Sequence, residues 1–163
     1  MKRVLVAAVI AAAAIIAMVA YAATKDEGAE VQTLTGTTLD GQPFDLADTR
    51  GTPTVVNFFF AKCVFCAQEA PDLVAFREAH PEVDVVGVAV YDSKEDTEAF
   101  VSKHGIKFPV VYEPEAATAN EWGVTGYPTT FFLDADGVVQ DTIVGAGTFD
   151  QFEASLETVQ PAG

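Results

Sequence analysis

Cysteine and histidine are scarce in this chain of 163 residues, which has two of each. Two cysteines are too few for a scaffold held together by several disulfides. A structural zinc or iron–sulfur site usually has four ligands, and only His80 and His104 could join Cys63 and Cys66. The composition therefore argues against a disulfide-rich scaffold and leaves a metal centre as a minor alternative.

Positively charged residues are scarce as well. Nine lysines and arginines stand against 24 aspartates and glutamates, and the net charge is −15. Two of these cations, Lys2 and Arg3, precede a long uncharged segment, so the rest of the chain is more acidic still. Such a charge argues against nucleic acid and anionic membrane surfaces as partners. A solvated, soluble surface is the simplest interpretation, and an acidic docking face is the alternative.

The longest hydrophobic run lies at the N-terminus, where residues 4–23 are uncharged and mostly apolar. This length suits a membrane-spanning helix, whereas Ala20-Tyr21-Ala22 fits the small-x-small pattern of signal-peptide cleavage. In both cases the positive-inside rule places the remainder outside the cytoplasmic membrane. We therefore expect a signal peptide or membrane anchor at 1–23, a linker at 24–30 and one folded domain at 31–163.

The hydrophobic pattern predicts an α/β fold. Residues 53–61 are β-branched and aromatic, and residues 83–90 are mostly valine, as in strands buried on both faces of a largely parallel sheet. Asp40-Gly41 and Asp134-Ala135-Asp136-Gly137 mark hairpin turns. Further strands are expected at 108–112, 129–133 and 138–144, and helices at 63–79, 93–104, 116–122 and 148–159.

Cys63 and Cys66 lie where the first buried strand ends and a helix begins. Helix N-termini present unpaired N–H groups and a partial positive charge, which stabilise a thiolate, the reactive form of cysteine. Lys62 adds a neighbouring cation and is expected to tune the thiolate pKa. We expect Cys63 to be an exposed attacking nucleophile and Cys66 a more buried resolving thiol. A purely structural disulfide is disfavoured, because so short a loop constrains the unfolded chain little.

The strand, the Cys63-Val64-Phe65-Cys66 motif and the following Glu69-Ala70-Pro71 resemble the thioredoxin-like oxidoreductases of the TlpA/ResA (DsbE-like) family. The resemblance extends to residues 105–111 and to residues 123–132, which include Tyr127-Pro128. It implies an α/β thioredoxin-like fold, a central mixed sheet flanked by helices, with an N-terminal β-hairpin and a central helix-plus-strand insertion. It also implies that Glu69 moves the proton of the buried thiol and that Tyr127-Pro128 forms a cis-proline loop against the dithiol.

Three positions bear on how closely the family pattern applies. Lys62 stands where tryptophan is usual, and no proline separates the cysteines, so Phe65 is expected to supply part of the apolar surface for substrate. Asn57 occupies the place of a buried aspartate in thioredoxins. Because Asn57 cannot titrate, Glu69 would have to take any acid–base role. Tyr127, Pro128 and Phe65 are the expected substrate contacts.

By resemblance, the expected function is thiol–disulfide exchange on exported proteins, without a bound cofactor, at the outer face of the cytoplasmic membrane or in a secreted or periplasmic form. Apocytochrome c is one candidate substrate, and a membrane or extracytoplasmic redox protein is the expected partner. Whether the protein reduces or forms disulfides stays open.

Three other functions compete with this expectation. A copper-delivery protein of the same fold usually spaces its cysteines further apart. A thiol peroxidase would need threonine at the position of Phe60. A non-catalytic binding module would require neither Glu69 nor an accessible Cys63.

Overall fold

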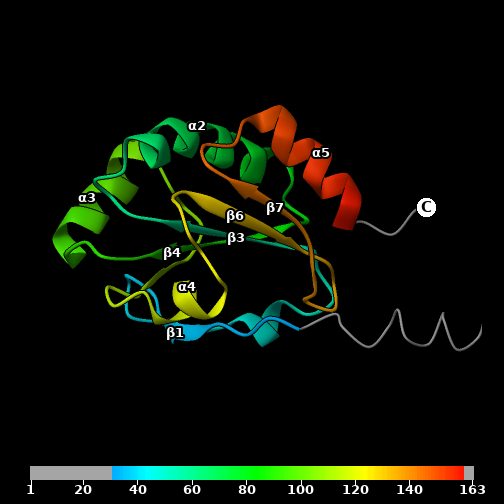
Figure 1. Cartoon of the computed structure of the whole chain (residues 1–163), viewed down its shortest axis with the longest axis horizontal. Helices are drawn as coiled ribbons and strands as arrows, with labels where there is room; N and C mark the ends of the chain where they lie inside the picture. The colour runs from blue at the N-terminus through cyan, green and yellow to red at the C-terminus, as the bar shows by residue number, and fades with distance from the viewer. Residues whose placement is uncertain (1–30, 160–163) are drawn as a thin grey trace, which may run out of the picture. The chain divides into compact units, whose positions relative to one another are not determined.

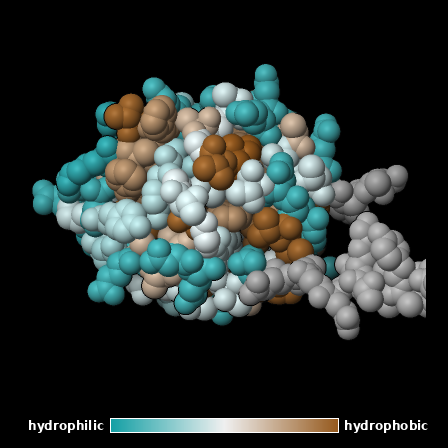
Figure 2. All heavy atoms as spheres, viewed as in Figure 1, coloured by the Kyte–Doolittle hydropathy of each residue, from teal (hydrophilic) through white to brown (hydrophobic). Residues whose placement is uncertain are grey.

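The computed structural model describes residues 31–159. The expected leader at 1–23 and linker at 24–30 therefore lie outside the described residues. Within residues 31–159, no helix has the length and apolar character needed to cross a membrane. On the face seen in Figure 2, hydrophobic residues lie in small patches separated by hydrophilic ones, in keeping with the acidic composition.

A five-stranded mixed sheet forms the centre of the fold, in the order β5-β4-β3-β6-β7 (Figure 1). Strand β3 pairs with β4 and β4 with β5 in parallel, whereas β6 is antiparallel to both β3 and β7. The strands are β3 (Thr54–Phe59), β4 (Asp84–Ala89), β5 (Val110–Tyr112), β6 (Thr129–Leu133) and β7 (Val139–Val144).

Helices cover one face of this sheet, and shorter elements cover the other (Figure 1). The first layer contains α2 (Val64–Ala79), α3 (Lys94–His104) and α5 (Phe149–Val159). The second contains the hairpin of β1 (Thr35–Thr37) and β2 (Pro43–Asp45), the 3-10 helix η1 (Leu46–Thr49) and α4 (Ala117–Glu121). This architecture confirms the predicted α/β class, with α3 and β5 as the central helix and strand.

Strand β3 alternates between the two cores. Val55 and Phe59 pack in the core beneath α2 and α5, whereas Val56 and Phe58 pack in the core beneath α4 and the hairpin. Side chains along a strand point alternately to opposite faces, so Asn57 lies on the α2 face with Val55 and Phe59. All six residues of β3 are buried. A buried asparagine in this apolar strand requires polar partners, and they lie in the candidate site.

Helix ends follow the local signals in the sequence. The Ser93 hydroxyl accepts a hydrogen bond from the Asp96 N–H at 3.1 Å, and Gly105 ends α3 with a φ of 67°. Strand β3 is shorter than the predicted 53–61, because the chain turns after Phe59. The Cys63 N–H donates to the Phe60 carbonyl at 3.1 Å in that turn. The turn places Cys63 directly ahead of α2.

Candidate active site

Cys63 is the N-cap residue of α2, as its position in the sequence predicts. Its Sγ accepts a hydrogen bond from the Cys66 N–H at 3.2 Å, in the place where a serine or aspartate oxygen usually caps a helix. The Cys63 thiol also donates to the Tyr127 carbonyl at 3.6 Å. Both cysteines are free thiols in this structure. The two sulfurs therefore belong to one helical turn, covered by the loop that contains Tyr127.

Both thiols are buried, so the expected exposure of Cys63 is wrong. Cys63 is 7% exposed and Cys66 is 3% exposed. Cys63 is covered because its sulfur folds back over the first turn of α2 and lies against the Tyr127 carbonyl. Cys66 is the more buried of the two, as expected. Burial raises the pKa of the Cys66 thiol, and its hydrogen bond with Cys63 raises it further.

Glu69 lies one turn beyond Cys66 and is 1% exposed. Its Oε1 accepts a hydrogen bond from the Asn57 amide at 2.6 Å, and its Oε2 accepts one from the Gly147 N–H at 2.8 Å. Burial raises the pKa of Glu69 to about 7, although the hydrogen bonds from Gly147 and Asn57 act in the opposite direction. The charge of Glu69 in turn raises the pKa of Cys66. Glu69 thus titrates near neutral pH and interacts with the buried thiol.

The sheet supplies the support for this carboxyl group. Asn57 of β3 pairs in register with Thr130 of β6, and its amide donates to the Thr130 hydroxyl at 2.8 Å. Gly147 approaches from the segment between β7 and α5. A Cβ at Gly147 would lie 2.4 Å from the Phe152 ring and 3.2 Å from Glu69 Oε2, so only glycine fits. The sequence pattern singled out neither Thr130 nor Gly147, because both reach Glu69 only through tertiary packing.

The residues expected to contact substrate differ in how far they are exposed to solvent. The Tyr127-Pro128 bond is cis, as the family pattern implies, and the Tyr127 ring packs against Phe60 and Tyr91. Phe65 lies between the cysteines on the first turn of α2 and is 59% exposed. An exposed aromatic ring at this place can contact a bound polypeptide. Tyr91 was not singled out by the sequence pattern.

The ammonium group of Lys62 lies beside Asp96 of α3 and Asp92, which precedes α3. Its Nζ lies 2.7 Å from an Asp96 oxygen and 3.4 Å from an Asp92 oxygen. The Asp92 carboxylate also accepts a hydrogen bond from the Lys62 backbone N–H at 3.2 Å. The hydrogen bond to Asp96 raises the pKa of Lys62. Two carboxylates therefore compensate the lysine charge that the sequence places beside Cys63.

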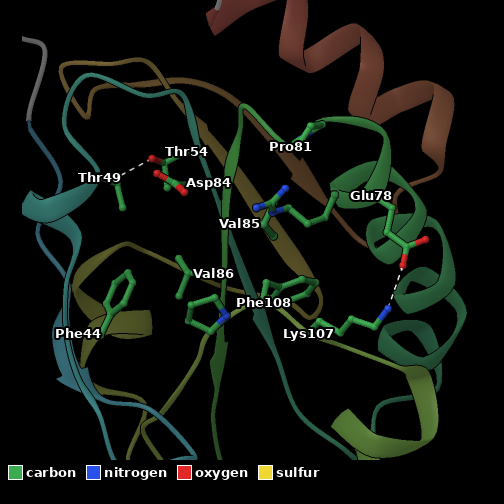
Figure 3. Close-up of a pocket in the computed structure, with 12 residues that line it drawn as sticks. Phe44, Thr49, Thr54, Glu78, Pro81, Asp84, Val85, Val86, Lys107 and Phe108 are labelled. Atoms are coloured by element: carbon green, nitrogen blue, oxygen red, sulfur yellow. Dashed lines mark hydrogen bonds and ion pairs between the residues drawn. The ribbon is translucent and has the colours of Figure 1, made fainter.

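A separate cavity of about 410 Å³ lies at the other end of the parallel strands, beside Thr54 and Asp84, the first residues of β3 and β4. Figure 3 shows Phe44 and Thr49 on one side of it and the Glu78–Lys107 ion pair, at 3.3 Å, on the other. None of the expected site residues lines this cavity. Within residues 31–159, no three histidine, cysteine, aspartate or glutamate side chains are grouped so that they could hold a metal ion.

Comparison with known families identifies the chain. Residues 28–142 match the AhpC/TSA family. The chain belongs to this family. A thiol–disulfide oxidoreductase ResA of Geobacillus kaustophilus is 31% identical over 127 residues, which cover 77% of this chain and 73% of that protein. The family and this relative show that the chain is a thioredoxin-like thiol–disulfide oxidoreductase, which confirms the expected fold and reaction class.

Solved structures agree with this assignment. A secreted Mycobacterium tuberculosis disulfide oxidoreductase homologous to Escherichia coli DsbE superposes with a TM-score of 0.71 at 31% identity, covering 76% of this chain and 94% of that one. A DsbF homologue from Corynebacterium diphtheriae superposes with a TM-score of 0.74 at 29% identity, covering 80% and 87%. The five-stranded sheet with its flanking helices is thus the fold of DsbE-like and DsbF-like proteins.

Proposed function

We propose that the protein exchanges disulfides with exported proteins, with Cys63 as the attacking thiol and Cys66 as the resolving thiol. The position of Cys63 at the N-cap of α2 carries this assignment, because the helix N-terminus favours negative charge on its sulfur. The Cys63 thiolate attacks one sulfur of a substrate disulfide and releases the other as a thiol. Cys66 then attacks the Cys63 sulfur, frees the second substrate thiol and closes the Cys63–Cys66 disulfide. Two electrons thereby pass to the substrate, and the reverse sequence oxidises a dithiol.

Glu69 is proposed as the group that accepts the proton of Cys66 before this second attack. Its burial and its pKa of about 7 support the role, since a base is most effective when its pKa lies near the working pH. The Cys66 thiol needs such a base, because burial raises its own pKa. Asn57, Thr130 and Gly147 are proposed to hold the carboxyl group in place.

Substrate contact is proposed for Phe65, Tyr127 and Pro128. The exposure of Phe65 and the 3.6 Å contact between the Cys63 sulfur and the Tyr127 carbonyl support this. An extended substrate segment can pair with the backbone of Tyr127, whose carbonyl lies beside the reacting sulfur, whereas Pro128 itself is buried. Lys62 remains a proposed modulator of the dithiol, acting against the compensating charges of Asp92 and Asp96.

The proposed place of action is outside the cytoplasmic membrane, as a folded domain at 31–163 that follows a leader at 1–23 and a linker at 24–30. Similarity to a soluble secreted antigen of Mycobacterium tuberculosis, 36% identical over 103 residues, supports export. Apocytochrome c is the proposed candidate substrate, with a membrane or extracytoplasmic redox protein as partner. The potential of the Cys63–Cys66 pair decides the direction: a value near about −270 mV indicates a reductant, and one near about −120 mV an oxidant.

Trapping of mixed disulfides tests the roles of the two cysteines. Cys66→Ser should accumulate covalent complexes with substrate proteins on non-reducing gels, because Cys63 can attack and no resolving thiol remains. Cys63→Ser should trap little. In the reduced wild type, iodoacetamide should modify Cys63 before Cys66. Equal trapping by the two variants would overturn the assignment of the nucleophile.

A further inference from the structure

Tyr91 has a backbone conformation that few large residues adopt. Its φ is 64°, in the left-handed region that favours glycine, and the residue is 58% exposed. A bulky residue with positive φ is an outlier, and such outliers concentrate at functional sites. An exposed tyrosine contributes little to a core, so the strained backbone is not offset by burial of its ring. The position of the ring is therefore the feature to explain.

The surrounding loops fix this conformation. The Tyr91 N–H donates to the Pro114 carbonyl at 3.2 Å, and the Asp92 N–H donates to the Val90 carbonyl at 2.8 Å. The Asp92 carboxylate then accepts the Lys62 backbone N–H at 3.2 Å. The turn that contains Tyr91 is thus hydrogen-bonded to the residue that immediately precedes Cys63.

Three aromatic rings meet beside the dithiol. Tyr91 lies 6.3 Å from Phe60 and 5.6 Å from Tyr127 between ring centroids, and Phe60 lies 5.5 Å from Tyr127, all in edge-to-face arrangements. The hydroxyls of Tyr91 and Tyr127 are 3.4 Å apart. Phe60 and Tyr127 are half-buried, whereas Tyr91 is open to solvent. The rings therefore form an aromatic wall, defined by Phe60, Tyr91 and Tyr127, whose exposed part is Tyr91.

This wall reaches the reacting sulfur, since the Tyr127 carbonyl accepts a hydrogen bond from the Cys63 thiol. We propose that Tyr91 determines substrate specificity, its exposed ring binding an aromatic or large apolar side chain next to the substrate cysteine. The proposal rests on the proposed role of Cys63 as the attacking thiol. An edge-to-face contact is the favourable arrangement for such a ring. Nearby carboxylates of Asp92, Asp96 and Glu113 outnumber the single cation of Lys62, so an acidic substrate side chain is disfavoured.

Matched substrates and variants test this role. The full-length reduced protein would be mixed with peptide disulfides in which the reacting cysteine is followed by phenylalanine, serine or glutamate. A small neutral disulfide, 2-hydroxyethyl disulfide, reports exchange without a flanking side chain. Tyr91→Gly and Tyr91→Asn remove the ring but tolerate the left-handed backbone, and Tyr91→Phe keeps the ring as the matched control. Urea unfolding monitors the fold of each variant.

The wild type should prefer phenylalanine over serine and serine over glutamate. Tyr91→Gly and Tyr91→Asn should react about tenfold more slowly with the phenylalanine peptide, the size of one good aromatic contact. Both should keep the wild-type rate with 2-hydroxyethyl disulfide and an unfolding midpoint no lower than the wild type, and Tyr91→Phe should keep the preference. An unchanged phenylalanine rate, or equal slowing with every disulfide, would overturn the role of Tyr91. Failure of the wild type to reduce 2-hydroxyethyl disulfide would instead reject the proposed chemistry of Cys63.

Discussion

Glu69 links stability to pH through a single buried carboxyl group. Its folded-state pKa of about 7 lies above the ordinary 4.5, so the folded state binds this proton more tightly than the unfolded chain does. Its contribution is therefore fully present below pH 4.5 and is lost as pH rises through about 7. Because Glu69 is buried, with 1% of its surface exposed, the difference between these two pKa values corresponds to about 3 kcal/mol of stability.

Glu69→Gln should remove this pH dependence. The variant loses a hydrogen bond at every pH. The NH2 group of the new glutamine is a donor, and it faces the N–H donor of either Asn57 or Gly147, which a carboxylate oxygen accepts in the wild type. In urea unfolding, however, the stability of the variant relative to wild type should increase as pH rises from 5 to 8, because only the wild type loses the contribution of Glu69 over that range. The wild-type exchange rate is expected to change near pH 7 as Glu69 titrates, and the variant should lose that change. Glu157→Gln, at an exposed position of α5, is the control and should keep the wild-type dependence of stability on pH. Parallel curves of stability against pH for Glu69→Gln and wild type would show that Glu69 does not titrate in this range.

Lys62 and Asp96 offer a test in which two changes have opposite signs. If the lysine charge reaches the dithiol, Lys62→Gln makes the reduction potential more negative, because a neighbouring cation stabilises the reduced, ionised form. Asp96→Asn removes a compensating charge 2.7 Å from Lys62 Nζ and makes the potential more positive. Glutathione redox titration of both variants measures the shifts. Shifts of the same sign, or none at either position, would show that the Lys62–Asp96 pair is screened from the sulfurs.

Among the helices and strands, the sequence correctly predicts the features that are set by residues close together in the chain, such as turns, helix ends and strand positions. Turn residues locate both hairpins, Ser93 and Gly105 locate the ends of α3, and the apolar runs locate β3 and β4. These signals are strong because each acts within a few residues of the feature it predicts. The same local logic correctly places Cys63 at the start of α2.

The errors and omissions share a different cause. Cys63 is buried because a loop more than sixty residues away in the chain lies over it, and Glu69 is held partly by Gly147. Tyr91 joins the site through ring contacts with Phe60 and Tyr127. No local pattern encodes such contacts, since they depend on how β3, β6 and the intervening loops meet.

Helices α2 and α5 are connected through His80, which follows the last residue of α2. Its ring nitrogens contact Glu82 and, on α5, Glu153. Burial acts to lower the pKa of His80, but the hydrogen bonds to Glu153 and Glu82 outweigh it and raise the pKa above its ordinary 6.5. The stabilisation is therefore complete below pH 6.5 and is lost as pH rises through the higher folded-state pKa.

Replacement of either partner should reveal this ion pair. His80→Gln and Glu153→Gln should each destabilise the protein by up to about 1 kcal/mol at pH 6, as for a partly exposed pair. The difference from wild type should be smaller at pH 9 than at pH 6, because His80 loses its proton as pH rises. Urea unfolding at the two pH values measures it, and the double variant should show less than the sum of the single losses. Equal losses at pH 6 and pH 9 would contradict a contribution from charge.

The whole molecule carries a charge of −15, and this sets its response to salt. Repulsion among carboxylates destabilises a compact chain, and dissolved salt screens that repulsion. Salt also weakens the ion pairs of Lys62, Lys94 and Lys107 with neighbouring acids, but those lysine side chains are 68%, 52% and 82% exposed, so each pair contributes little. The repulsion should dominate, because 24 acidic residues far outnumber nine basic ones.

The thermal midpoint should therefore rise between about 0.01 and about 0.5 M sodium chloride, with most of the rise at low salt, where the screening length changes fastest. Lys107→Glu, which reverses one exposed partner of Glu78, should steepen the rise. A midpoint that falls with salt would mean that the exposed ion pairs outweigh the net charge.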